Sequence, residues 1–266
     1  MTPALKRETT EKSFIVQILR LMEYLSCHVA DHVTTVNESY QKLLCARNRI
    51  PTNKISVIRQ GPDPNLIRPT EPDRQLRARA GTIIAYLGNM SSQDGVEHLL
   101  YALQKLDSCY EYQDWFCLLI GQADDPEHLN ELASKLEIAD RVWFTGYVKR
   151  DEWVQYLSTA DICVEPAPAN PLNSISTMNK IMDYMAMRKP CVVYDLLENR
   201  VTAADSALYA RPNDTEDLAR LIFYLSEHPE ERERLGNIGR KRIEEKLALA
   251  YQTSKLRELF ERLTAR

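Results

Sequence analysis

Residues 161–196 read DICVEPAPANPLNSISTMNKIMDYMAMRKPCVVYDL and hold an apolar run, an amphipathic stretch and a second apolar run. The runs at 161–166 and 191–196 have the length of buried strands, and the stretch near 176–187 is long enough for a helix. Parallel strands need a crossover connection of this kind, whereas antiparallel neighbours can be joined by a hairpin. The stretch therefore predicts a strand–helix–strand unit of a parallel sheet.

The same alternation extends on both sides of this unit. Further strands are expected at 82–87, 116–121, 141–144 and 206–210. Helices are expected near 94–107, 126–138 and 150–159, and after Asn213, which with Glu216 has the spacing of a capping box. Six strands with helical crossovers predict an α/β fold, a doubly wound parallel sheet of Rossmann-like type with helices on both faces. Such sheets bind ligands beyond the carboxyl ends of their strands, here the loops after residues 87, 120, 145, 165 and 195.

Composition excludes several classes of protein. With 44% apolar and 27% charged residues the chain can bury a substantial core, and a net charge of −4 gives no basic footprint for nucleic acid. No apolar run approaches the roughly 18 residues of a membrane span, and the polar N-terminus lacks the apolar core of a signal peptide. None of the six cysteines stands in a C-x-x-C pair. We therefore expect a cytoplasmic protein whose strand cysteines are buried free thiols.

The first 70 residues have a different pattern. Residues 13–29 carry a helical apolar stripe, and two strands are expected at 32–37 and 55–61 with a helix near 38–47 between them. Two strands do not make a stable sheet by themselves. Residues 1–70 are therefore expected to be the remnant of a second α/β domain.

A polar stretch with four arginines, at 68–81, is predicted to be a solvated linker. The main domain is expected over 71–247. The segment 248–266 is expected to be a C-terminal helix that packs back toward the N-terminal part.

Residues 165–200 carry the chemistry. Three prolines stiffen a loop after a strand, and a Ser-Ile-Ser-Thr run is expected to open a helix whose free N–H groups form an anion site. Lys180 lies in the first turn, where its charge opposes the helix dipole unless an anion is bound. Asp183 follows about one turn later, within reach of a ligand's hydroxyl groups. This pattern indicates a nucleoside diphosphate site; the alternative is a capped structural helix on which Lys180 and Asp183 are solvated.

At this point the chain resembles a known family. The segment 171–196, PLNSISTMNKIMDYMAMRKPCVVYDL, is similar to the donor-binding, C-terminal half of bacterial family 4 glycosyltransferases with the GT-B fold. Weaker similarity extends through 30–40, 57–63, 86–100, 141–148, 206–219 and 234–242. The resemblance covers residues 20–245.

The resemblance implies retaining transfer of a sugar from a nucleotide diphosphate sugar, usually UDP-linked, in cell-surface polysaccharide biosynthesis. The nucleotide sugar is the donor substrate, and neither a cofactor nor an essential metal is implied. The candidate catalytic residues are Lys180, beside the donor pyrophosphate, and Asp183, in place of the glutamate that holds the ribose. The candidate donor-binding residues are Ser176, Thr177, Met178 and Asn179 at the pyrophosphate, Gly88, Asn89 and Gly95 in the glycine turn, and Gly146, Tyr147 and Val148 at the base.

Several positions depart from the family pattern. Asp183 is one methylene shorter than the usual glutamate, and Ile175 replaces a glutamate that many members direct toward the sugar. The glycine turn lacks the Arg/Lys pair of many members. Arg188 stands where the family usually has glycine, which requires a permissive backbone at a helix end.

The largest departure is that most of the N-terminal acceptor half, which holds the family's catalytic histidine, is expected to be missing. A partner chain or a homo-oligomer would then supply the acceptor domain for a glycan or lipid-linked acceptor. The alternative is a non-catalytic nucleotide-sugar-binding or scaffolding subunit. A nucleotide-sugar 2-epimerase is a third possibility, against which the STMNK segment argues.

Smaller features have rival interpretations. His28 and His32 have a spacing that can hold a metal on a helix, but no further ligand cluster accompanies them. Four basic residues with the apolar stripe suggest a helix on the inner membrane face, although packing against another protein half is favoured: Lys6, Arg7, Lys12 and Arg20. Of the acids at the ends of the strand at 161–166, Glu165 is placed to touch a sugar, and Asp161 is expected to cap or to pair locally.

Overall fold

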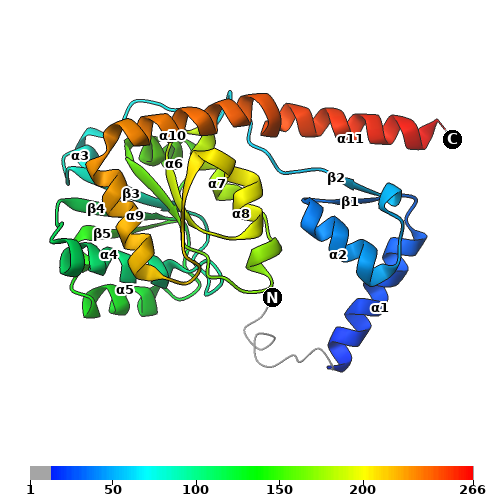
Figure 1. The fold of residues 1–266 in the computed structure, drawn as a ribbon, viewed down its shortest axis with the longest axis horizontal. Coiled ribbons are helices and arrows are strands. Elements are labelled where there is room, and N and C mark those ends of the chain that lie inside the picture. The colour runs from blue at the N-terminus through cyan, green and yellow to red at the C-terminus, as the bar shows by residue number, and fades with distance from the viewer. Residues whose placement is uncertain (1–12, 266) are drawn as a thin grey trace. The chain divides into compact units, whose positions relative to one another are not determined.

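The computed structural model describes residues 13–265, and the chain divides into two compact units (Figure 1). One unit is Gln60–Thr253, and the other combines Met1–Arg59 with Ser254–Arg266. Of the four basic residues that suggested a membrane-surface helix, Arg20 lies in α1 (Phe14–Val29), whereas Lys6, Arg7 and Lys12 lie outside the described residues. No helix within residues 13–265 is long and apolar enough to cross a bilayer.

The larger unit is built on a six-stranded parallel sheet with the order β5-β4-β3-β6-β7-β8. Its strands are β3 (Thr82–Leu87), β4 (Trp115–Ile120), β5 (Val142–Gly146), β6 (Ile162–Glu165), β7 (Cys191–Tyr194) and β8 (Ala207–Ala210). This confirms the predicted α/β, doubly wound fold. The winding reverses between β3 and β6, and loops that leave such a point diverge to opposite faces and open a crevice.

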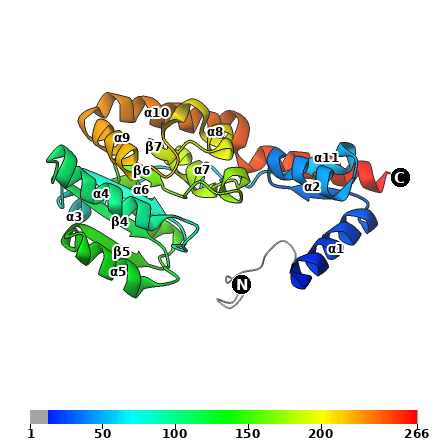
Figure 2. The same cartoon turned by 60° about the horizontal axis from the view of Figure 1, so that its bottom comes forward.

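Helices cover both faces of the sheet (Figure 2). Alternate strand residues divide between two cores: Ile84 and Tyr86 pack on one face, Ile83 and Ala85 on the other. The helices of this unit are α3 (Arg74–Arg77), α4 (Val96–Tyr110), α5 (Pro126–Lys135), α6 (Arg150–Thr159), α7 (Asn179–Ala186), α8 (Leu197–Ala203), α9 (Thr215–Glu227) and α10 (Pro229–Arg242). The cysteines predicted to be buried free thiols in the strands are fully buried and free, which confirms that expectation: Cys117, Cys163 and Cys191.

The capping box predicted at Asn213 is wrong by one residue. Asp214 is the cap of α9, and its carboxylate accepts hydrogen bonds from the N–H groups of Glu216 and Asp217 at 3.0 Å each. Asn213 has a φ of 62°. A left-handed residue of this kind does not have the extended backbone that an N-cap requires.

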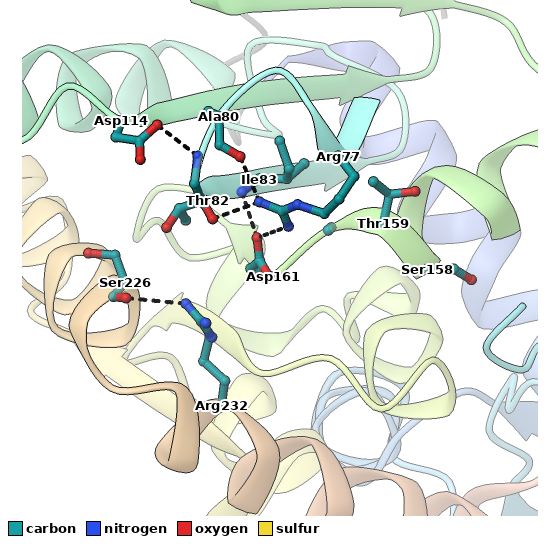
Figure 3. Close-up of polar contacts among 12 residues, drawn as sticks. Arg77, Ala80, Thr82, Ile83, Asp114, Ser158, Thr159, Asp161, Ser226 and Arg232 are labelled. Carbon is teal, nitrogen blue, oxygen red and sulfur yellow. Dashed lines mark hydrogen bonds and ion pairs between the residues drawn. The ribbon is translucent and has the colours of Figure 1, made fainter. Parts of the chain in front are cut away.

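The segment predicted as a solvated linker is instead fixed to the amino ends of the strands (Figure 3). Arg77, on α3, pairs with Asp161 and donates to the carbonyl groups of Ala80 and Gly81 at 2.7 and 2.6 Å. The carboxylate of Asp161 also accepts from the N–H of Ile83 at 2.8 Å, so Asp161 is paired, but with residues 78 and 84 positions away and not locally. The expectation of solvated arginines is therefore wrong for Arg77.

The smaller unit holds a two-stranded parallel sheet, β1 (Val33–Thr35) and β2 (Ile55–Val57), with α1 (Phe14–Val29) and α2 (Glu38–Asn48). Its buried core is small: Cys27, Ile50 and Ile55. The apolar stripe of α1 is mostly exposed, because only Cys27 of this helix is buried. The C-terminal helix α11 is Leu249–Thr264.

Candidate functional site

Three neighbouring strands end in glycine at the carboxyl edge of the sheet. Gly88, Gly121 and Gly146 follow or close β3, β4 and β5, with φ angles of 141°, 132° and 67°. A Cβ on Gly121 would lie 2.1 Å from the carbonyl oxygen of Gly88, and Gly121 also bridges Gly146. L-residues rarely adopt such φ values, so glycine lets these strand ends turn and cross closely. The predicted Gly88 and Gly146 therefore lie along one edge.

At the reversal point the loops after β3 and β6 touch one another. A Cβ on Gly95, at φ 70°, would lie 2.2 Å from the carbonyl oxygen of Pro166. The side-chain amide of Asn173 donates to the carbonyl of Gln93 at 3.0 Å. The glycine turn from 88 to 95 and the proline loop from 166 to 178 are therefore joined by direct contacts.

Lys180 lies between these loops and is not solvated. Its Nζ is 2.9 Å from the hydroxyl of Tyr86, 3.0 Å from Asp94 Oδ1 and 3.2 Å from Glu165 Oε2. The Lys180 side chain is only 11% exposed, which contradicts the solvated alternative. Burial acts to lower the pKa of Lys180, but the surrounding acidic groups outweigh burial and raise it above its usual value.

Glu165 is fully buried at the end of β6. Its Oε1 accepts from the N–H of Ala167 at 3.2 Å, whereas Oε2 has no hydrogen bond of good geometry although Lys180 Nζ is near it. Burial raises the pKa of Glu165. A direct contact between Glu165 and a sugar is thus not available in this arrangement, and the side chain serves Lys180 instead.

Asp183 lies one turn after the start of α7 and is partly buried. Within the described part of the chain, its carboxyl group has no hydrogen-bond or ion-pair partner. Burial raises its pKa to about 7, and no cation offsets that effect. A buried carboxyl group without a partner is suited to accept hydrogen bonds from a ligand's hydroxyl groups.

The helix predicted from residue 176 begins three residues later. Ser176 has an extended backbone, with φ −91° and ψ 133°, because it closes the 3₁₀ turn Asn173–Ile175. Its hydroxyl donates to the carbonyl of Leu172 at 2.8 Å. Helix α7 starts at Asn179 with Met178 as its N-cap, and no side chain caps it there. The predicted residues therefore lie just before and at the start of α7, where the helix dipole is positive: Ser176, Thr177, Met178 and Asn179.

The remaining predicted residues occupy different surroundings. The carbonyl oxygen of Asn89, in the glycine turn, accepts a hydrogen bond from the hydroxyl of Tyr86. Tyr147 is 76% exposed after β5, and Val148 beside it is half-buried. Strand β4 separates β5 from β3, so these two residues lie on the far side of β4 from Lys180.

Two further sequence expectations can be compared with the structure. Arg188 has a φ of 55° at the end of α7, as the replacement of glycine there requires. His28 Nδ1 donates to the carbonyl of Tyr24, and His32 Nε2 shares a hydrogen bond with the hydroxyl of Ser56. Among residues 13–265 no group of three His, Cys, Asp or Glu side chains is arranged to hold a metal ion.

Sequence reasoning missed Tyr86 and Asp94 as partners of Lys180. Asp94 stands immediately before Gly95 in the glycine turn, and Tyr86 belongs to an apolar strand that pattern analysis assigns to the core. An acid within a glycine turn was the available signal for Asp94. No periodicity signals that a strand tyrosine points its hydroxyl toward a lysine 94 positions away.

Residues 81–228 match the family model of the glycosyl transferases group 1. The chain belongs to this family. The matched residues span all six strands of the larger unit and the loops after β3 and β6, so the group 1 domain includes the candidate site.

The relatives of this group 1 chain are distant and longer. An uncharacterized glycosyltransferase of Methanocaldococcus jannaschii is 26% identical over 183 residues, which cover 66% of this chain and 45% of the relative. Sucrose-phosphate synthase from Thermosynechococcus elongatus matches in structure with a TM-score of 0.79 at 20% identity, over 100% of this chain and 64% of that one.

A third similar structure is HepE from Anabaena, solved in complex with UDP-glucose. Its TM-score is 0.80 at 18% identity, and the match covers 95% of this chain and 69% of HepE. These neighbours share the GT-B fold with the group 1 chain. The chain spans about half the length of the curated relatives it matches.

Proposed function

We propose that the chain is the donor half of a retaining glycosyltransferase that transfers a sugar from a nucleotide diphosphate sugar. The observation that carries the proposal is the set of segments that meet where the winding of the sheet reverses. There the Gly88 turn lies against the uncapped start of α7. The unpaired carboxyl group of Asp183 lies one turn further along the same helix. Membership of the group 1 family supports the reaction class.

The proposed arrangement assigns a role to each group. Backbone N–H groups at Met178 and Asn179 bind the donor pyrophosphate, with Lys180 beside it, because the helix end carries partial positive charge. Asp183 accepts hydrogen bonds from the ribose hydroxyl groups. The backbone at Gly146 reads the base. Catalysis is electrostatic: negative charge that develops on the leaving diphosphate is stabilised by preorganised N–H groups and by the lysine.

A UDP-linked donor and a role in cell-surface polysaccharide synthesis are the finer parts of the proposal. The structural neighbour HepE was solved with UDP-glucose, which makes UDP the first nucleotide to test. A glycan or lipid-linked acceptor suits a position at the inner membrane face.

Calorimetric titration with UDP, ADP and GDP tests the donor site. We expect UDP to bind with a Kd in the micromolar to millimolar range, and Asp183→Ala to weaken it about tenfold or more, the scale of hydrogen bonds to a charged group. Asp140→Ala is the matched control, because Asp140 is an exposed carboxylate before β5, at the opposite end of the sheet. A folded protein that binds none of the three nucleotides contradicts the proposal.

The acceptor domain is proposed to come from a partner chain or from a second copy. The exposed apolar residues of α1 support this: Phe14, Ile15, Ile18, Leu19, Leu21, Met22, Leu25 and Val29. A surface of this kind is typical of an interface. The same observation favours the second candidate function, a nucleotide-sugar-binding subunit without turnover. Hydrolysis or transfer of UDP-sugars by this chain alone, followed by NMR of the product anomer, rejects the second candidate and tests retention.

A further inference from the structure

Three oxygen atoms surround the ammonium group of Lys180, and its side chain is only 11% exposed. An ammonium group carries three N–H donors, and three oxygen atoms, from Tyr86, Asp94 and Glu165, lie within 3.2 Å of Nζ. A phosphate group can therefore reach the charge of Lys180 only if one of these partners moves away.

The two carboxylates differ in how readily they can move. Glu165 belongs to β6 and is fully buried. Asp94 belongs to a loop, and its side chain is 24% exposed. Its second oxygen, Oδ2, accepts from the N–H and the hydroxyl of Ser91 at 3.1 and 2.7 Å. Asp94 would keep these two hydrogen bonds after losing Lys180, so it is the partner that can be exchanged.

An anion that binds at the start of α7 would lie next to Lys180 Nζ, where Asp94 now lies. Lys180 is the second residue of α7, whose N-cap has no side-chain acceptor. A Cβ on Gly88 would lie 3.0 Å from Lys180 Cε, so the glycine turn rests on the lysine stem. An anion bound at the helix end or at this turn arrives beside Nζ. Exchange of one anion for another leaves no buried ammonium unpaired at any stage, which avoids a large desolvation cost.

We infer that Asp94 holds Lys180 in the ligand-free protein in the place of a donor phosphate, and that donor binding moves Lys180 from Asp94 to the diphosphate. The inference rests on the proposed function and names the residue that sets donor affinity. Asp94 competes with the donor for the lysine, and the competition lowers affinity for any nucleoside diphosphate.

The variant Asp94→Asn tests this, with UDP as the probe in calorimetry at fixed pH and low ionic strength. The amide keeps an oxygen for the Ser91 hydrogen bonds but loses the charge that holds Lys180. We expect UDP to bind about fivefold more tightly, the scale of the net contribution of one ordinary hydrogen bond. Asp140→Asn makes the same change in net charge at the far end of the sheet and is expected to alter UDP affinity by less than about twofold.

A double-variant cycle separates exchange from a structural role of Asp94. In a Lys180→Met background, Asp94→Asn is expected to give no gain in UDP affinity, because the gain acts through the lysine. Asp94→Ser, which also removes the charge, provides a second measurement if Asp94→Asn unfolds. Unchanged or weaker UDP binding in these single variants overturns the inference. If the wild-type protein binds no nucleoside diphosphate, the proposed function itself fails; wild-type binding without a gain in the Asp94 variants rejects the exchange alone.

Discussion

Asp183 makes the free energy of unfolding depend on pH in a way that can be calculated from its burial. Its pKa rises from 3.8, the ordinary value, to about 7 in the folded protein. The folded state therefore binds the proton more tightly than the unfolded chain does. The stability from this proton is fully present below pH 3.8 and is lost as the pH rises through 7.

The magnitude follows from the size of the shift. Each pKa unit corresponds to about 1.4 kcal/mol, so a shift of roughly three units costs the folded state about 4 kcal/mol at pH 8. At pH 5 most of Asp183 is protonated in the folded protein, and the cost is below about 2 kcal/mol. The variant Asp183→Asn has no proton to lose. Its stability relative to wild type should rise by about 2–3 kcal/mol between pH 5 and pH 8.

Thermal unfolding of both proteins at pH 5 and pH 8 measures this difference. For a unit of this size each kcal/mol shifts Tm by about 2–4 °C, so the gap between variant and wild type should change by roughly 5–10 °C. The fixed cost of burying an amide is equal at both pH values and cancels. A gap that does not change with pH refutes the assignment of a buried, unpaired carboxyl group at Asp183. The same titration should make UDP affinity rise from pH 6 to pH 8, because the ionised carboxylate is the better acceptor for ribose hydroxyl groups.

Three further predictions concern the surroundings of the site. Arg188→Gly should stabilise the protein by about 1 kcal/mol in chemical denaturation, because glycine adopts the φ of 55° without strain; an unstable variant contradicts this. Gly95→Ala should cost about 2 kcal/mol or more and abolish UDP binding, since its Cβ would lie 2.2 Å from the oxygen of Pro166; normal binding shows that the loops can separate freely. Arg77→Met should lower stability by about 1–2 kcal/mol through loss of the contact with Asp161, and Arg77→Lys should restore less than half, because lysine cannot replace the forked hydrogen bonds. Full rescue by lysine would indicate that charge alone matters.

The sequence predicted the fold because strands that are buried on both faces of a parallel sheet appear as nearly continuous apolar runs. The six apolar runs matched strands β3 to β8, and no strand end moved by more than two residues. Local signals failed where backbone conformation was decided by neighbours. Asp214 caps α9 in place of Asn213, whose side chain instead accepts from the N–H of Ala169 in the proline loop, 44 positions away. Helix α7 starts at Asn179 because a 3₁₀ turn precedes it.

For the candidate site, the sequence determined the types of group and their order along the chain. Helical and strand periods fix local spacing, so the sequence predicts three features of the site. These are the glycines at strand ends, the lysine in the first turn of α7 and the carboxyl group one turn later. Only the tertiary structure decided what these groups face. Lys180 meets Tyr86, Asp94 and Glu165, from two other strands and a loop, and Asp183 meets no partner at all within the described chain. Contacts between distant segments depend on sheet order and on the packing of loops, which no local pattern encodes, and they set whether each charge is available to a ligand.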